Sequence, residues 1–204
     1  KHNGPVEDTN LVNRLIGLKT FKKKINFDTY PSLEAQISAI SDDIAYNNHD
    51  IQDGIKANLF KLEELIEIDF FKSIYLKYKN KINKTNYKIA TYQIVRDSID
   101  LMIKDLLVNT KKNLKDQKIK SIKNIAASSK PIVSFSEKIQ FSEREIKLFL
   151  RTKMYQNKAV LRKNQKGKVI VKKLFNIIKS NPRKFITKDH LTKDKYRAIS
   201  DFIS

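Results

Sequence analysis

The order of apolar and polar residues along the chain predicts a protein built from long helices. Apolar side chains recur every three or four positions over most of the sequence, the period of a helix with one side facing a core. The predicted helices cover about residues 32–54, 59–78, 136–155, 158–180 and 193–204. A further long helix follows a polar loop at residues 79–86, and its apolar side is formed by Ile94, Ile99, Met102, Ile103, Leu106 and Leu107.

Capping and turn residues mark where these helices begin and end. Ser32 is a candidate N-cap, with Glu34 in the first turn of the helix that it opens. Gly54 marks either the end of that helix or a close packing contact. Residues 128–131 form a clear break, and the one candidate strand, residues 131–135, is short and weak. With only four glycines and four prolines, the chain has too few turn residues for an all-β protein, so the predicted fold class is all-α.

Composition narrows the class of protein further. The 204 residues are enough for a real core, although 40% hydrophobic and 31% charged residues is a polar balance. The absence of cysteine excludes disulfides, thiolate metal sites and a thiol nucleophile, and it fits a cytoplasmic protein. No apolar run is long enough to span a membrane, and the first residues do not have the pattern of a signal peptide.

The formal charge of +20 permits two interpretations. It favours a polyanionic partner, and the basic stretch from Arg162 to Lys173, with Tyr155 and Phe175 nearby, could bind a nucleic-acid backbone without sequence specificity. Alternatively, the charge reflects a lysine-rich composition and the stretch is a solvated helix face. Arginine, the better ligand for bases and phosphates, is scarce beside lysine.

The helix predicted at residues 32–54 has two chemically different sides. At about 100° per residue, six apolar residues form the side expected to face the core: Leu33, Ile37, Ile40, Ile44, Ile51 and Ile55. The opposite side carries Asp42, Tyr46, His49, Asp50 and Asp53. Carboxylates, a phenol and an imidazole on one face could hold a divalent cation and a sugar hydroxyl, whereas the alternative is an ordinary solvated face.

Several segments resemble bacterial dGTPase-like proteins of the HD superfamily of phosphohydrolases. The most specific is SLEAQI at residues 32–37 with DDIAYNNHDIQDG at residues 42–54, which resembles the signature helix of that family. Further segments are similar to later family helices or to a family segment: YQIVRDSIDLMI at 92–103, FS at 135–136, IKLFLRTKMY at 146–155, YRAISDFI at 196–203 and KHNGP at 1–5. The resemblance implies an HD-domain-like helical bundle that lacks its N-terminal helices. It also implies two parts: residues 1–60, with the helix of the last HD-motif aspartate, and the helical C-terminal part, residues 61–204.

The resemblance also implies a reaction and site residues. Family members hydrolyse a deoxynucleoside triphosphate to deoxynucleoside and triphosphate with a divalent metal, for which Mg²⁺ or Mn²⁺ is expected. Asp42 takes the place of the final metal-ligating aspartate, with Asp43 as the competing assignment. Tyr46 would pack against the deoxyribose, and Asp50 would accept from its 3′-hydroxyl. Arg96 could pair with a phosphate, or form a structural salt bridge instead. Family members commonly assemble, so a homo-oligomer is possible.

The histidine pattern departs from that of the family. The metal-ligating His and His-Asp pair of the family precede the region that matches Lys1, and the chain has only three histidines. His2 belongs to the first similar segment, His49 lies within the final-aspartate helix, and His190 is expected at the surface. One carboxylate cannot hold a catalytic metal. The chain is therefore expected to be a fragment, inactive alone; the alternative is a catalytically dead basic module that binds nucleic acid or another polyanion.

Overall fold

The computed structural model describes residues 28–83, 86–187, 190–191 and 194–204, and these residues form helices without a strand. The all-α prediction is thus confirmed for the described part of the chain. His2 and the similarity at residues 1–5 lie outside it. The chain divides into two compact units, of which the first ends at Arg151 and the second begins at Thr152. The division predicted near residue 60 concerns the family motif and stays a prediction.

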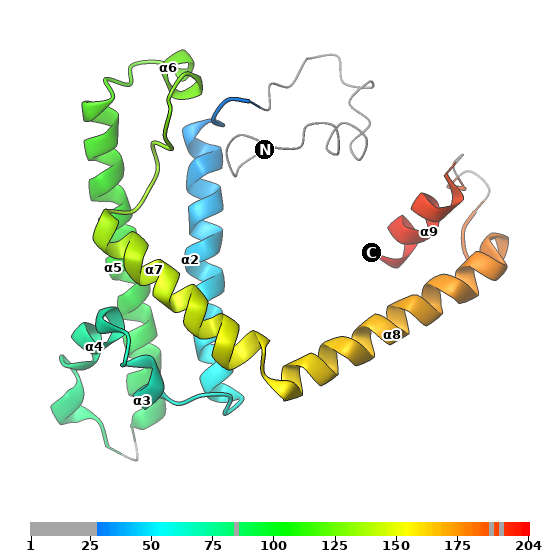
Figure 1. The fold of residues 1–204 in the computed structure, drawn as a ribbon, viewed down its shortest axis with the longest axis horizontal. Helices are drawn as coiled ribbons and strands as arrows, with labels where there is room; N and C mark the ends of the chain where they lie inside the picture. The colour runs from blue at the N-terminus through cyan, green and yellow to red at the C-terminus, as the bar shows by residue number, and fades with distance from the viewer. Residues whose placement is uncertain (1–27, 84–85, 188–189, 192–193) are drawn as a thin grey trace. The chain divides into compact units, whose positions relative to one another are not determined.

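The first unit is organised around three helices. Figure 1 shows α2 (Leu33–Lys56) beside α5 (Tyr87–Asp116) with opposite chain direction, and α7 (Glu137–Leu150) crossing them. Shorter elements complete the unit: α3 (Leu62–Leu65), α4 (Asp69–Tyr75), the 3-10 turn η2 (Lys79–Lys81) and α6 (Ile122–Ala126). The core contains side chains from all three long helices and from α3 and α4, among them Ile51, Leu65, Phe71, Ile94, Met102, Ile146 and Leu150.

The predicted start of α2 is correct, and its predicted core side is partly correct. Ser32 Oγ accepts from Ala35 N at 3.4 Å and caps the helix. Ile44 and Ile51 are buried, but Ile37 is 47% exposed. The buried side also includes the polar residues Gln36, Asn47 and Asn48, together with Gly54.

The single helix predicted at residues 59–78 is wrong, because the chain breaks there into α3 and α4. Ile68 adopts an extended backbone with ψ of 119° between the two. The buried apolar residues of this segment follow one another at intervals of one to three: Phe60, Leu62, Leu65, Ile68, Phe70, Phe71 and Ile74. A straight helix would spread them around its circumference, whereas the break turns them all into the core. The loop prediction at 79–86 likewise missed η2.

The long helix after residue 86 is confirmed as α5. Ile94, Met102 and Leu106 are buried, but Ile103 and Leu107 are 44% and 56% exposed, so the predicted apolar side was too wide. The short helix α6, which follows α5, was not predicted.

Residues 131–135 are irregular rather than a strand. Side-chain amides replace the strand partner: Gln36 Oε1 accepts from Ile132 N at 2.9 Å and from Val133 N at 3.1 Å. Asn113 Nδ2 donates to the carbonyl of Ile132 at 2.9 Å, and Asn109 Nδ2 donates to that of Ser134 at 2.8 Å. These bonds satisfy the backbone of a buried segment without a β-ladder.

The predicted helix at residues 136–155 is α7, followed by the π-helical turn η3 (Arg151–Tyr155), in which the boundary between the units lies. The second unit then contains α8 (Lys158–Ser180), the 3-10 turn η4 (Pro182–Lys184) and α9 (Lys195–Ile203). The bounds of α8 agree with the prediction; α9 starts at Lys195 rather than Lys193, a residue outside the described part. The core of the second unit is formed by Ile178, Ile186 and Ile199, with Phe175, Leu191 and Ile203 packed against them. No described helix is long and apolar enough to cross a membrane.

Candidate functional site

Helix α2, which carries the predicted site residues, is fixed against α5 by a buried amide. Asn48 Nδ2 donates to the carbonyl of Ile44 at 2.8 Å and contacts Met102 Sδ at 3.7 Å. Its Oδ1 accepts from the hydroxyl of Ser98, which is fully buried on α5. Because a buried polar group is costly unless it is hydrogen-bonded, this contact favours one rotation of α2 about its axis.

A second amide fixes the other end of α2. Gln36 Nε2 donates to the carbonyl of Pro31 at 2.9 Å, while its Oε1 accepts from Ile132 N and Val133 N in the segment that leads into α7. The sequence analysis did not place Gln36 and Asn48 in the core, because their side chains are polar. The signal that could have found them is their position beside Ile40, Ile44 and Ile51 on the apolar side of the helix.

This packing leaves the predicted polar side of α2 accessible. Asp42 is exposed, Tyr46 is 59% exposed and Asp50 is half-buried. Four residues correspond to a rotation of about 40°, so the three side chains follow one another along one face. The structure therefore brings Asp42, Tyr46 and Asp50 together on one side of one helix. His49 and Asp53 are also exposed.

Asp43, the competing candidate for the metal ligand, has a protein partner. Its Oδ2 lies 3.2 Å from Lys147 Nζ on α7, and the same ammonium pairs with Glu143. Partial burial lowers the pKa of Lys147, but the hydrogen bond and charge of Glu143, together with those of Asp43, outweigh it and raise the pKa above its ordinary value. Asp43 thus takes part in an ion-pair network between α2 and α7.

Arg96 is not brought to the Asp42–Asp50 face. It is exposed on α5, two residues before Ser98, which contacts α2. Two residues correspond to about 200° of rotation, so Arg96 lies on the side of α5 away from α2. The carboxylate of the next residue, Asp97, accepts a hydrogen bond from the hydroxyl of Tyr78 at 2.8 Å. A phosphate contact of Arg96 therefore stays a prediction that this geometry does not support.

The described residues do not form a complete metal site. They contain no group of three or more His, Asp or Glu side chains close enough to hold an ion. Asp42 could supply one hard oxygen ligand of the kind that Mg²⁺ or Mn²⁺ prefers, but one carboxylate cannot fix the coordination of a catalytic metal. No reaction step through a metal is therefore derived for this chain.

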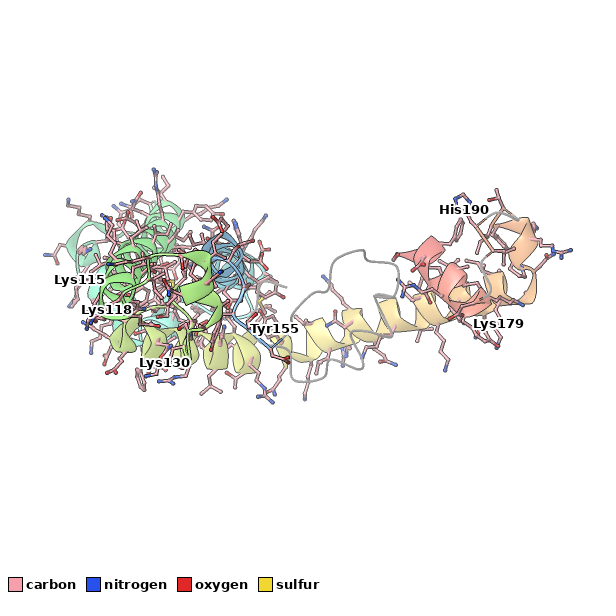
Figure 2. The ribbon with its side chains drawn as sticks, turned by 90° about the horizontal axis from the view of Figure 1, so that it is seen from above. Lys115, Lys118, Lys130, Tyr155, Lys179 and His190 are labelled. Atoms are coloured by element: carbon pink, nitrogen blue, oxygen red, sulfur yellow. The ribbon has the colours of Figure 1, made fainter. Side chains whose placement is uncertain are left out.

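The local charge of α2 is opposite to that of the rest of the molecule. The chain as a whole has 42 basic and 22 acidic residues, whereas α2 has five acidic residues and one lysine. By contrast, α8 has eight basic residues and no acidic one. Figure 2 labels some of the lysines outside α2: Lys115, Lys118 and Lys130 on the first unit and Lys179 on the second. A general lysine bias of composition does not explain an acidic α2.

The C-terminal part of the chain is similar to a known protein family. Residues 133–204 match the family model of the phosphohydrolase-associated domain. The match covers 72 of the 204 residues and the described elements within it are all helices, so the C-terminal part of the chain is similar to a phosphohydrolase-associated domain.

Curated relatives extend the similarity to the whole chain, including α2. A deoxyguanosinetriphosphate triphosphohydrolase-like protein of Pelagibacter ubique is 60% identical over 204 residues, which are all of this chain and 55% of that protein. Proteins with the same name are 32% identical over 210 residues in Rickettsia typhi and 33% identical over 180 residues in Leptospira interrogans. These alignments cover 100% and 85% of this chain, and 54% and 47% of the relatives. The chain is thus similar over its whole length to dGTP triphosphohydrolase-like proteins, as the resemblance of its sequence predicted, and it spans about half the length of the relatives it matches.

Proposed function

We propose that this chain forms part of a deoxynucleoside triphosphate triphosphohydrolase, to which α2 contributes one metal ligand and two substrate contacts. Asp42 would ligate the divalent metal, Tyr46 would pack against the deoxyribose, and Asp50 would accept from the 3′-hydroxyl. The observation that carries the proposal is the exposed face on which these three side chains follow one another. Its support is twofold: the buried amides of Gln36 and Asn48 hold the helix, and α2 is acidic within a basic chain.

Each role follows from the chemistry of its group. A carboxylate supplies the hard oxygen that a divalent cation needs, and a second carboxylate two turns later can accept from a hydroxyl. A phenol ring between them offers an apolar surface to a sugar and a hydroxyl at its edge. Metal activation of water would need ligands beyond Asp42, so hydrolysis by this chain alone is not expected.

The test is release of inorganic triphosphate from a deoxynucleoside triphosphate in the presence of Mg²⁺ or Mn²⁺. We would assay the 204-residue chain alone and a chimera that adds the part of the Pelagibacter ubique relative that the chain does not match. We expect activity only in the chimera, its loss in Asp42→Ala, and its retention in Asp43→Ala. Because Asp42 is exposed, its replacement should leave the circular dichroism spectrum unchanged. Full activity of Asp42→Ala would contradict the assigned role.

A second candidate function, the binding of a nucleic-acid backbone, is favoured by α8. Its eight basic residues are exposed and have no acidic neighbour on the helix. Such binding would be non-specific and would weaken steeply with salt. Fluorescence anisotropy of a labelled single-stranded oligonucleotide would test it, with Lys163→Gln and Lys172→Gln reducing the salt dependence. Binding that is independent of these lysines would show that α8 is only a solvated surface. Of the two aromatic residues near the basic stretch, Phe175 is already stacked on Tyr196, with ring centroids 6.3 Å apart.

A further inference from the structure

The first unit contains a cavity that the proposed hydrolysis does not use. It has a volume of about 750 Å³ and lies where the end of α2, the segment into α3 and the first turns of α5 meet. This size falls within the range of small-molecule sites, roughly 300–1,000 Å³. Three aromatic side chains line it, Phe60, Tyr87 and Tyr92, and three lysines surround it, Lys56, Lys61 and Lys88.

The aromatic wall at Phe60 is held in place by tight packing. Phe60 is 2% exposed and meets Phe149 edge-to-face, with ring centroids 4.9 Å apart. Its ring occupies the space left by Gly54, where any side chain would collide with it. The phenyl ring therefore forms a fixed surface rather than a mobile one.

The wall formed by Tyr87 is fixed by hydrogen bonds at both ends of the residue. Its phenol oxygen accepts from Leu62 N at 3.3 Å and donates to Glu63 Oε2 at 3.2 Å. Its carbonyl accepts from the hydroxyl of Thr91 at 2.8 Å. Burial, together with the nearby charge of Glu63, raises the pKa of Tyr87, so the phenol is neutral at physiological pH. A wall that is already ordered loses little entropy when a ligand binds.

Three lysines and two glutamates line the cavity, which leaves a net formal charge of +1, and both glutamates accept hydrogen bonds from its wall. Lys88 Nζ lies 5.9 Å from the centroid of the Tyr92 ring. Glu63 accepts from Tyr87, and Glu64 Oε2 accepts from Lys61 N at 2.9 Å. The amides of Gln52 and Asn58 add neutral donors and acceptors. The cavity thus combines flat apolar surfaces with ammonium groups at its edge.

We propose that this cavity binds a small planar aromatic molecule that carries a negative charge. The aromatic part lies against the partly exposed rings of Tyr87 and Tyr92, where offset or edge-to-face contacts are favourable. The anionic group meets the ammonium of Lys61, with Lys56 and Lys88 adding to the positive potential. The proposal does not depend on the hydrolase function, because none of its residues belongs to the Asp42–Asp50 face.

The experiment separates the contribution of the ring from that of the charge. The 204-residue chain would be titrated by calorimetry with 1-naphthyl phosphate, with 1-naphthol, which keeps the ring, and with inorganic phosphate, which keeps the charge. We expect 1-naphthyl phosphate to bind about tenfold or more tightly than either, since one charge-assisted hydrogen bond corresponds to about that factor. Equal binding of the phosphate and the naphthyl phosphate, or no binding of the latter, would overturn the proposal.

Matched variants place the binding in this cavity. Lys61→Gln should weaken 1-naphthyl phosphate about tenfold and leave 1-naphthol unchanged, whereas Tyr92→Ala should weaken both. Lys72→Gln, at an exposed lysine of α4 outside the cavity, should change nothing. An equal loss in Lys72→Gln would show a general effect of charge and refute the site. Adenosine monophosphate and 4-hydroxybenzoate, titrated in the same way, would distinguish a nucleotide from an aromatic carboxylate as the source of the ligand.

Discussion

Helices α2 and α8 are nearly equal in length but differ in burial and in charge. Of the 24 residues of α2, six are buried, whereas of the 23 residues of α8 only Ile178 is buried. Leu161, Ile170, Val171 and Ile177 are all more than half exposed on α8. Helix α2 has a net formal charge of −4 from five acidic residues and one lysine, and α8 has +8.

The comparison shows where a side chain can be assigned a chemical role. Packing and buried amides fix the rotation of α2, so the positions of Asp42, Tyr46 and Asp50 follow from the fold. Along most of α8 the described residues provide no such constraint, although Lys179 near its end lies 5.1 Å from the centroid of the Tyr196 ring on α9. Charge on α8 therefore indicates at most a non-specific contact, whereas the face of α2 can support a specific one.

Replacing a single isoleucine by alanine should give the largest difference in unfolding free energy between the two helices. Ile51 on α2 is fully buried, and Ile170 on α8 is 63% exposed. Ile51→Ala should lower the free energy of unfolding by about 2–5 kcal/mol, since it removes buried methyl groups and leaves a cavity. Ile170→Ala should change it by less than about 0.5 kcal/mol. Urea denaturation followed by far-ultraviolet circular dichroism measures both, and equal losses would show that α8 is buried in solution.

Removal of a glutamine should also affect the two helices differently. Gln36→Ala leaves the amides of Ile132 and Val133 without their acceptor in a buried segment. This should cost about 2–3 kcal/mol, because unsatisfied buried donors are expensive. Gln165 is exposed on α8, and Gln165→Ala should be neutral or slightly stabilising because alanine is the better helix former. The same denaturation curves test the pair, and a small effect of Gln36→Ala would mean that water reaches residues 132 and 133.

Glycine-to-alanine substitutions should change the free energy of unfolding in opposite directions in the two helices. A Cβ at Gly54 of α2 would collide with the ring of Phe60, whereas at Gly167 of α8 it would meet nothing within 4 Å. Gly54→Ala should destabilise by about 1–3 kcal/mol through overpacking. Gly167→Ala should stabilise by about 0.5–1 kcal/mol through helix propensity. Thermal melts of both variants decide the signs, and stabilisation by Gly54→Ala would show that Phe60 can move.

Sequence patterns predicted the helices best where their signals were local. Ser32 as N-cap and the start of α8 at Lys158 needed only neighbouring residues, and both are correct. The break at Ile68 could not be read from propensity, because it depends on a core that several apolar residues share. Residues 131–135 were read as a weak strand because their amide partners, on α2 and α5, lie far away in the sequence.

The candidate site was predictable only as a pattern on one helix. The spacing of Asp42, Tyr46 and Asp50 placed them on one face, and the structure agrees. Arg96 was assigned from similarity alone, and its side of α5 depends on how two helices pack, which spacing does not give. The preference for Asp42 over Asp43 stays a prediction, and the structure adds that Asp43 has an ion-pair partner on α7. The smallest predicted effect addresses this choice.

Lys147 should stabilise the packing of α2 on α7 only slightly. Its pair with Asp43 is half-exposed, with side-chain exposures of 46% for Lys147 and 55% for Asp43, whereas Glu143 is 14% exposed. Lys147→Met should therefore cost about 1 kcal/mol at pH 7. Because the pKa of Lys147 is raised on folding, this contribution is present below the ordinary value of 10.5 and is lost as the pH rises through the raised value. Lys172→Met, on exposed α8, should leave the free energy of unfolding at pH 7 nearly unchanged.

A double-mutant cycle turns the same interaction into a test of the two aspartates. Asp43→Asn combined with Lys147→Met should give a coupling energy of about 0.2–1 kcal/mol, as expected for an exposed ion pair. Asp42→Asn with Lys147→Met should give none, because the α2 carboxylate that pairs with Lys147 is Asp43, and Asp42 is rotated about 100° away from it. Denaturation at pH 7 in low salt measures both cycles. Coupling through Asp42 instead would mean that Asp42 faces α7, and the metal-ligand role would then pass to Asp43.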